Sequence, residues 1–424
     1  MHYKIAYLTS KDPLDKNQAS GVYYYQSRAL KKQNMEIHHL GPVNILIKRF
    51  LKSGFKLVNR LLNKKYNIDH SIVISKIYGR IFSKKLKKGN YDIVFADKAS
   101  CELAYINTDI PVIYSTDGTF KLLNNYYPHL SGLFKISEKE GNIIEQNAIN
   151  RSSIIICASR WAASSVINDY NCPPEKVHII PRGANIDIIP DKELIANKKK
   201  NDVCRLLFIG SEYYRKGYDI AYETMSYIRS KGIPVRLIAA GCCPPSEFID
   251  KDVEIMPYLN KNTQKGMATF NKLMLNSDFY LLPTRAECMG IGFCESAAYG
   301  LPVITRDTGG VCEVVKNGIN GYTLDRKADH RDFGEKIISI FKSDENYYNL
   351  VRASRIYFEE RLNWDVWSAN LKNIFDGYFA YRIQEQTIYP RLNGNTLHSG
   401  IDLNPSFAGR FMETSARVFN DPIK

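Results

Sequence analysis

The chain alternates short apolar runs with longer segments whose apolar residues recur at helical spacing. The apolar runs are rich in Ile, Val and Leu and occupy residues 3–8, 91–96, 111–116, 153–159, 204–210, 235–241, 279–284 and 302–307. Short continuous runs of this kind are typical of strands buried on both faces of a parallel sheet. Helical spacing lies between them, as in Gly21 to Lys32. The pattern predicts an α/β protein with doubly wound, Rossmann-like parallel sheets.

The alternation occurs twice, with a polar, lysine-rich stretch over residues 191–202 between the two halves. We expect an N-terminal Rossmann-like domain over 1–188, joined by a C-terminal helix over 364–382. A second Rossmann-like domain should cover 189–363, and the turn-rich residues 384–424 should form a tail. Ligands gather at the carboxyl ends of parallel strands, so the site should lie in a cleft between the two sheets.

Composition excludes several classes of protein. The chain has 424 residues, of which 44% are hydrophobic and 24% charged, as in ordinary globular proteins. No apolar run is long enough for a transmembrane helix, and the N-terminal one is too short for a signal peptide. The nine cysteines have no C-x-x-C spacing, and His and Cys do not cluster as metal ligands do. We therefore expect buried free thiols, no metal site and a cytoplasmic protein.

The net charge of +14 is concentrated in residues 45–90, which carry +12. Within them, Lys48, Lys52, Lys56 and Arg60 recur every four residues and share one face of a helix predicted over 45–62. Such a basic amphipathic helix either lies on anionic lipid, at the inner face of the cell membrane, or packs on its domain with an ordinary solvated face. We favour the membrane. No nucleic-acid-binding motif accompanies the charge, so we do not expect nucleic acid as a partner.

Two acids flank a glycine loop in the segment PTRAECMGIGFCESAAYGLPVITRDTGG, which begins at Pro283. Glu287 comes before Gly290 and Gly292, and Glu295 comes after them in the first turns of a predicted helix. Helix N-termini attract anions, glycine permits close approach of a ligand, and carboxylates accept hydrogen bonds from hydroxyls. A nucleotide sugar offers both phosphates and hydroxyls. Glu295 alone is also explained as an acid favoured by the helix dipole.

A second cluster follows another predicted strand, in the segment GSEYYRKGYD. Gly210 ends the strand, and Arg215 and Lys216 precede a predicted helix. Cations near a helix N-terminus are unfavourable unless an anion is present, and a bound diphosphate would supply one. The alternative is a solvated surface pair.

The segment from Glu287 to Glu295 resembles the E-x7-E signature of retaining glycosyltransferases with the GT-B fold, and its surroundings resemble glycosyltransferase family 4. The same family resemblance extends to the segments SGVYYYQSRAL, HIIPRGANID, FIGSEYYRKG and TGGVCEVVKNGINGYTL. It covers roughly residues 1–380. The resemblance implies transfer of a sugar from a nucleotide-sugar donor to a glycan or lipid-linked glycan, with retention and without a metal cofactor. It points to synthesis of cell-surface polysaccharide or lipopolysaccharide.

The resemblance also implies roles for residues. Glu295 would bind the ribose hydroxyls and Glu287 the transferred sugar, while Lys216 and Arg215 would neutralise the leaving diphosphate beside Gly210. Gly21 would let the N-terminal loop approach that diphosphate from the other side. The backbone amides of the loop between the two acids would hold the sugar and phosphates; these belong to Met289, Gly290, Ile291, Gly292 and Phe293.

The sequence departs from the family pattern at two positions. Ser211 stands where an arginine often follows the strand glycine, and Arg215 is a candidate substitute. Asp117, in YSTDGTF, lies where the family often has a histidine; it would contact donor or acceptor, or simply form a turn before Gly118. The D-x-D pair Asp250 and Asp252, a spacing that often binds metal in other glycosyltransferases, should be solvated surface.

Two other functions remain open at this point. A nucleotide-sugar epimerase of the same fold would need acid and base groups in the cleft but no acceptor. A non-catalytic protein could keep the GT-B fold as a scaffold, although Glu287, Glu295 and Lys216 disfavour this. A dehydrogenase is disfavoured because no G-x-G-x-x-G follows the first strand.

Overall fold

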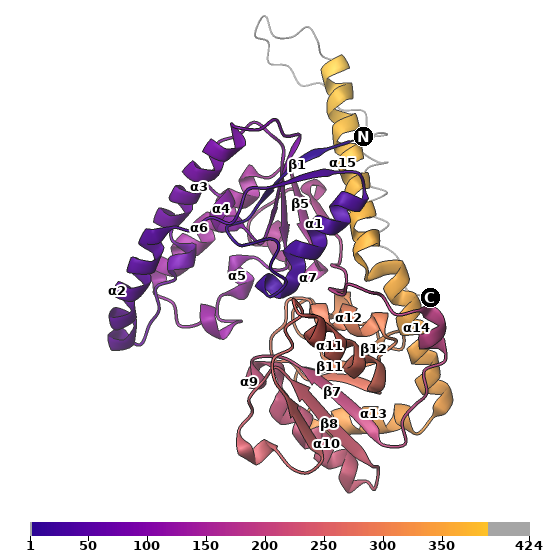
Figure 1. Ribbon diagram of the computed structural model, residues 1–424. Helices are drawn as coiled ribbons and strands as arrows, with labels where there is room; N and C mark the ends of the chain where they lie inside the picture. The colour runs from indigo at the N-terminus through magenta and orange to yellow at the C-terminus, as the bar shows by residue number, and fades with distance from the viewer. Residues whose placement is uncertain (1, 389–424) are drawn as a thin grey trace, which may run out of the picture.

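The computed structural model describes residues 2–388 and contains two parallel six-stranded sheets, each covered by helices (Figure 1). The first sheet has the order β2-β1-β3-β4-β5-β6, and its strands are β1 (Lys4–Leu8), β2 (Glu36–His39), β3 (Ile93–Asp97), β4 (Val112–Thr116), β5 (Ile154–Cys157) and β6 (Val177–Ile179). The second has the order β12-β11-β10-β7-β8-β9, and its strands are β7 (Cys204–Ile209), β8 (Val235–Ala240), β9 (Val253–Met256), β10 (Phe279–Leu282), β11 (Val303–Arg306) and β12 (Gly321–Leu324). The predicted fold class is confirmed.

Helices connect the strands within each half of the chain. Those of the first half are α1 (Val22–Lys32), α2 (Leu46–Leu62), α3 (Ile72–Leu86), α4 (Ser100–Leu103), α5 (Phe120–Leu123), α6 (Lys135–Arg151) and α7 (Arg160–Asn168). Those of the second half are α8 (Lys192–Ala196), α9 (Tyr213–Lys216), α10 (Tyr218–Ser230), α11 (Gln264–Asn276), α12 (Ile291–Ala298), α13 (His330–Phe341) and α14 (Asp344–Arg361). The lysine-rich stretch between the halves contains the short helix α8, whose Ile195 is buried in the second core.

The apolar pattern did not predict β2, β6, β9 or β12. Each of them lies at an edge of its sheet. Edge strands are only partly covered, so they carry polar residues such as Glu36 and His38 in place of a continuous apolar run. The buried central strands were the ones that hydrophobicity identified.

The last helix, α15 (Trp364–Ile388), returns the chain to the first domain. It follows α14 directly and packs along α1 (Figure 1). The aromatic side chains of Trp367 and Phe375 are buried in the core cluster that also holds Tyr3 and Ile5 of β1. The helix extends beyond its predicted end at 382, and the rest of the predicted tail, 389–424, lies outside the described residues.

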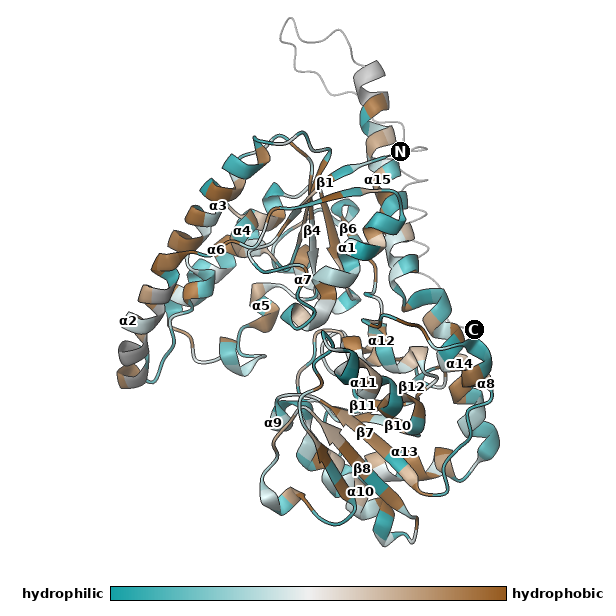
Figure 2. Cartoon of the chain, in the orientation of Figure 1, coloured by the Kyte–Doolittle hydropathy of each residue, from teal (hydrophilic) through white to brown (hydrophobic). Residues whose placement is uncertain are grey.

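Helix α2 projects at one side of the first domain and has apolar and polar faces (Figure 2). Phe55 on its inner side stacks on Tyr66, with ring centroids 4.7 Å apart. Lys48 belongs to the predicted basic face, but it is paired within the protein, because its Nζ lies 2.6 Å from a carboxylate oxygen of Asp69. The outer apolar side chains are exposed; these are Leu46, Ile47, Phe50, Leu61 and Leu62. Within the described part of the chain, no helix has both the length and the apolar character needed to cross a membrane.

The nine cysteines are free thiols, and seven of them are buried as predicted. Cys243 and Cys312 are exposed, so the prediction of burial is wrong for these two. Cys243 lies in the loop after β8 and Cys312 in a short 3-10 helix over Val311–Glu313, where a small side chain need not enter a core.

Candidate functional site

A cavity of about 330 Å³ lies between the two domains, where the carboxyl ends of strands from both sheets meet. The first domain contributes Lys16, Asn17, Ala19, Ser20, Val22, Lys98, Asp117, Tyr127 and Arg182. The second domain contributes the glycine loop and both signature acids, together with Gly210, Ser211, Arg215, Lys216, Tyr258, Leu259 and Lys261. The structure thus brings the two sequence clusters into one site, although Lys216 and Glu287 are 71 residues apart in the chain.

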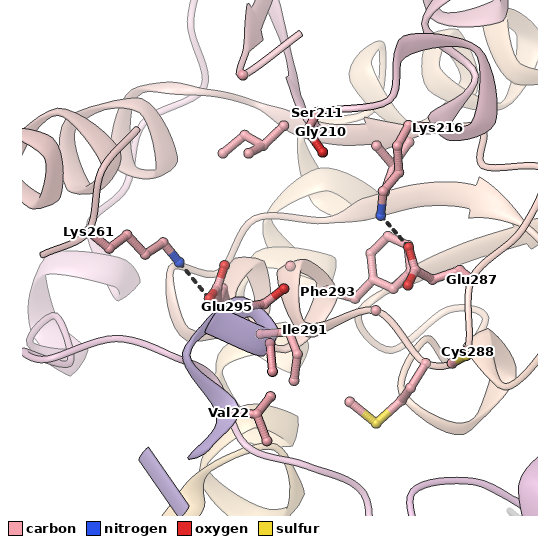
Figure 3. A pocket seen from close by; sticks show the side chains of 18 of the residues that line it. Val22, Gly210, Ser211, Lys216, Lys261, Glu287, Cys288, Ile291, Phe293 and Glu295 are labelled. Atoms are coloured by element: carbon pink, nitrogen blue, oxygen red, sulfur yellow. Dashed lines mark hydrogen bonds and ion pairs between the residues drawn. The ribbon is translucent and has the colours of Figure 1, made fainter. Parts of the chain in front are cut away.

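Glu287 forms an ion pair with Lys216 in the cavity (Figure 3). Arg215 Nη1 lies 3.8 Å from the same carboxylate and donates a hydrogen bond of 2.7 Å to the carbonyl of Ala286. Lys216 can lie across the end of β7 because Gly210 has no side chain there; a Cβ would be 2.8 Å from the Cγ of the lysine. The lack of a side chain at Gly210 therefore leaves the space that the side chain of Lys216 occupies.

Glu295 is paired with a cation that the sequence analysis did not identify. Lys261 Nζ lies 2.6 Å from Glu295 Oε1 and also donates to the carbonyl of Asn185 at 3.4 Å (Figure 3). Only 5% of Glu295 is exposed. Burial raises the pKa of this carboxyl, and the ammonium of Lys261 partly opposes that rise. A buried carboxylate of this kind can accept hydrogen bonds from a ligand without competition from bulk water.

The glycines between the two acids allow the backbone to turn into helix α12. Gly290 has φ of 90°, and a Cβ on it would lie 2.4 Å from the ring of Phe293. A Cβ on Gly292 would lie 2.5 Å from the hydroxyl of Tyr280. Met289, Ile291 and Phe293 also line the cavity, so the first turn of α12 faces it. The N–H groups of a helix start are suited to anions.

Asp117 does more than form a turn. Its carboxylate accepts a hydrogen bond from Arg182 Nη1 at 2.5 Å, and Lys98 Nζ lies 3.7 Å away. The other terminal nitrogen of Arg182 donates to the fully buried Asp97 at 2.7 Å. Although burial acts in the opposite direction, Arg182 and Lys98 hold the pKa of Asp117 below its usual value. Asp117 therefore presents a fixed negative charge to the cavity.

Gly21 precedes α1 with φ of 87° and makes the turn that opens the N-terminal helix. The cavity is lined by its neighbours Ser20 and Val22, and Gly21 shapes the loop between them. Lys16 in the same loop forms an ion pair of 2.7 Å with Asp187, the last residue of the junction segment HIIPRGANID. The N-terminal loop is thereby tied to the junction.

One expectation about helix position needs correction. Arg215 and Lys216 lie at the C-terminal end of the short helix α9, where cations are favoured, and Gly217 separates them from α10. The anion beside them in the structure is Glu287, so their position alone does not require a phosphate. Glu295 lies in the second turn of α12.

The D-x-D pair does not reach the cavity. Asp250 and Asp252 both accept hydrogen bonds from Arg229 Nη1, at 2.9 and 2.5 Å. Both side chains are partly exposed and lie outside the residues that line the cavity, which agrees with the surface position that we predicted. Across residues 2–388, the structure contains no group of three or more His, Cys, Asp or Glu side chains placed to hold a metal ion.

Four charged residues of the site were missed in the sequence; these are Lys16, Lys98, Lys261 and Arg182. Lys98 follows the predicted strand β3, so its position after a strand was an available signal, whereas Lys261 follows β9, which the apolar pattern did not predict. Arg182 lies in the junction segment HIIPRGANID, where only its family resemblance drew attention. Nothing in the local sequence indicated that it would be buried between two acids.

Comparison with known proteins agrees with this geometry. Residues 23–188 match the family model described as Glycosyltransferase Family 4, and residues 190–356 match the model described as Glycosyl transferases group 1. The chain belongs to the glycosyltransferases of the GT-B fold. Within that class it resembles family 4.

Individual relatives are distant. An uncharacterized glycosyltransferase of Methanocaldococcus jannaschii is 24% identical over 257 residues, which cover 58% of this chain and 65% of the relative's length. The solved structure of sucrose-phosphate synthase from Thermosynechococcus elongatus is 13% identical, with a TM-score of 0.65, and covers 89% of this chain and 100% of its own. A structure of Anabaena HepE in complex with UDP-glucose is also 13% identical and covers the same shares, with a TM-score of 0.58. At this identity the structures show a shared fold.

We predict that Asp117→Asn lowers the free energy of unfolding by about 3 kcal/mol at pH 7, because Arg182 loses a buried partner. The folded pKa of Asp117 lies below the unfolded value of 3.8, so the stabilisation is complete well above that value. The stabilisation by Asp117 should shrink as the pH falls below 3.8, because the carboxyl of the unfolded chain is protonated at a higher pH than that of the folded chain. Urea unfolding between pH 7 and pH 3 measures this difference. The non-titrating control Ser230→Ala should differ from wild type by an amount independent of pH, and a similar pH-independent difference for Asp117→Asn would contradict the assignment.

Proposed function

We propose that the protein transfers a sugar from a nucleotide-sugar donor to a glycan or lipid-linked glycan, with retention at the anomeric carbon and without a metal ion. Cell-surface polysaccharide or lipopolysaccharide synthesis is the process that uses such products. The observation that carries the proposal is an interdomain cavity lined by the two acid–cation pairs, Glu287 with Lys216 and Glu295 with Lys261, around a glycine loop.

The charges of the cavity fit a nucleotide diphosphate sugar. Each signature acid is paired with a lysine. A diphosphate can replace the Glu287 carboxylate as the partner of Lys216, which frees Glu287 to accept hydrogen bonds from the sugar. Ribose hydroxyls can donate to Glu295, which stays anionic because Lys261 remains beside it. The complex of the fold neighbour HepE with UDP-glucose supports a donor of this class.

Leaving-group stabilisation explains how transfer proceeds. The bond between the anomeric carbon and the diphosphate oxygen breaks, and its electron pair leaves with the diphosphate. Lys216, Arg215 and the start of α12 are fixed positive groups directed at that developing charge. The acceptor hydroxyl oxygen then bonds to the anomeric carbon on the same face, and its proton passes to the departing phosphate oxygen.

The first domain supplies the acceptor side of the cleft. Asp117 lines the cavity opposite Glu287, and its charge is fixed by Arg182 and Lys98. A carboxylate there can orient an acceptor or donor-sugar hydroxyl by accepting a hydrogen bond from it.

Helix α2 fits an anionic lipid surface. Its exposed apolar residues Leu46, Ile47, Phe50 and Leu61 lie along one side of the helix, next to the basic positions of the sequence pattern. Exposed leucines and phenylalanine beside cations are typical of helices that lie in the interface of a membrane. We infer that α2 brings the enzyme to a lipid-linked acceptor at the inner face of the cell membrane.

Donor binding should depend on Glu295. We expect Glu295→Gln to raise the dissociation constant of the cognate donor about tenfold, because a charged hydrogen-bond acceptor of the ribose is lost. Titration calorimetry with UDP-, GDP-, ADP- and dTDP-sugars measures the constant and identifies the nucleotide. Glu335→Gln, at an exposed position of the same domain, is the control. Equal affinity of wild type and Glu295→Gln would remove Glu295 from the donor site.

Turnover should depend on Lys216 more than binding does. Lys216→Ala should lower kcat about a hundredfold while changing donor affinity much less, since charge on the leaving diphosphate grows towards the transition state. Lys231→Ala, at an exposed lysine of the second domain, should leave kcat unchanged. Product analysis from donor alone is the companion measurement: release of a free epimer without an acceptor would point to an epimerase instead.

Membrane binding should require the apolar side of α2. The wild-type protein should sediment with vesicles that contain anionic lipid, and much less with neutral vesicles. Phe50→Ser together with Leu61→Ser should reduce that binding, whereas Ile356→Ser, an exposed apolar residue of the second domain, should not. Equal sedimentation with neutral and anionic vesicles would refute the role of α2.

A further inference from the structure

Two consecutive tyrosines of the first domain reach across the cleft to the loop that carries Glu287. Tyr126 and Tyr127 follow helix α5, and both of their backbone N–H groups donate to the carbonyl of Leu123, at 3.1 and 3.2 Å. The preceding Asn125 has φ of 61°, and its backbone N–H donates a hydrogen bond to the carbonyl of Leu130. The tyrosines thus stand on a short, internally bonded turn, and their hydroxyls point out of the first domain into the second.

Tyr126 pairs with the backbone of Glu287 in both directions. Its hydroxyl donates to the Glu287 carbonyl at 3.1 Å and accepts from the Glu287 N–H at 2.9 Å. The same oxygen lies 2.9 Å from the hydroxyl of Thr308. Its ring packs against Trp161 of the first domain, with centroids 5.3 Å apart. The position of Glu287 is therefore set partly by a residue of the other domain.

Tyr127 makes the equivalent contact with the next residue of the loop. Its hydroxyl accepts from the Cys288 N–H at 3.1 Å and donates to Cys288 Sγ at 3.2 Å. The guanidinium of Arg215 lies over its ring, 5.2 Å from the centroid. Burial raises the pKa of both tyrosines, so both hydroxyls keep the proton that they donate.

Two glycines complete the arrangement from the other side. A Cβ on Gly309 would lie 2.0 Å from the Glu287 carbonyl oxygen and 2.6 Å from the Tyr126 hydroxyl. A Cβ on Gly310 would lie 2.2 Å from the Cys288 carbonyl oxygen, which accepts a hydrogen bond of 2.8 Å from the N–H of Gly310 itself. The backbone of Glu287 and Cys288 thus lies between two glycines of its own domain and two tyrosines of the other domain.

We propose that Tyr126 and Tyr127 form a clamp that holds Glu287 in position for transfer and couples this position to closure of the two domains. The tyrosines are positioning residues, because they act through the backbone of Glu287 and Cys288. When the first domain moves away, the loop loses both hydroxyls, and the carboxylate beside Lys216 is no longer fixed. Transfer is then restricted to the closed state, in which the acceptor domain is in place. The catalytic part of this inference rests on the proposed role of Glu287, whereas the domain contact does not.

The test uses Tyr126→Phe, Tyr127→Phe and the double variant in the full-length protein. Each single variant keeps its ring and loses the hydroxyl, so kcat should fall about fivefold to tenfold and about fiftyfold in the double variant. Donor affinity should stay within twofold of wild type, because the donor contacts of the second domain are intact. Tyr91→Phe, at the amino-terminal end of β3 and remote from the cleft, is the matched control.

Small-angle X-ray scattering supplies a readout independent of activity. The double variant without ligand should have a larger radius of gyration than wild type and Tyr91→Phe, since the closed arrangement has lost its hydrogen bonds. Unchanged scattering together with unchanged kcat would overturn the clamp. A rise in donor dissociation constant with unchanged kcat would also overturn it, because the tyrosines would then be donor ligands. If the wild type transfers no sugar from any donor, the proposed function fails, and the scattering still decides whether the clamp exists.

Discussion

A carboxylate removed from water must have a cation or hydrogen-bond donors beside it, and the cleft of this protein is organised by that requirement. Glu287 is paired with Lys216, Glu295 with Lys261, Asp117 with Arg182 and Asp187 with Lys16. Each pair joins segments that are far apart in the chain. The charged groups of the cavity are therefore held in position by one another, and among the residues that line it six cations stand against three carboxylates.

Under the proposed function, these ion pairs also explain how the site can accept a strongly anionic ligand. A diphosphate that takes over Lys216 does not meet an isolated cation, so its affinity depends on the exchange of one anion for another. The released Glu287 then becomes available to hydroxyls. On this proposal, the same lysine and glutamate change partners when the donor binds, which is a reason for a lysine with rotatable donors at this position.

The two sheets place these groups because both direct the carboxyl ends of their strands at the same cleft. Helix α15 connects the two domains, because it starts after α14 of the second domain and packs in the core of the first domain next to α1. On this side of the cleft, the two domains are joined by the chain itself and by the apolar packing of α15. The opposite side is closed by polar contacts, namely the tyrosines on the Glu287 loop and Arg160, whose N–H donates to Glu313 at 2.9 Å. Hydrogen bonds that exchange with water are suited to a contact that opens and closes.

The sequence by itself determined the buried strands, their alternation with helices and the two clusters at strand ends, because hydrophobic burial and glycine turns are local properties of a segment. Glu287, Glu295, Lys216 and the glycine loop were identified in this way and by family resemblance. Tertiary structure alone decided which cation pairs with which acid. Lys261, Arg182 and the two tyrosines find their partners 34 to 161 residues away in the chain, and local patterns carry no information about such contacts. The edge strands were not predicted for a related reason. A strand at an edge has a neighbouring strand on one side only, and its partial exposure therefore depends on its place in the sheet.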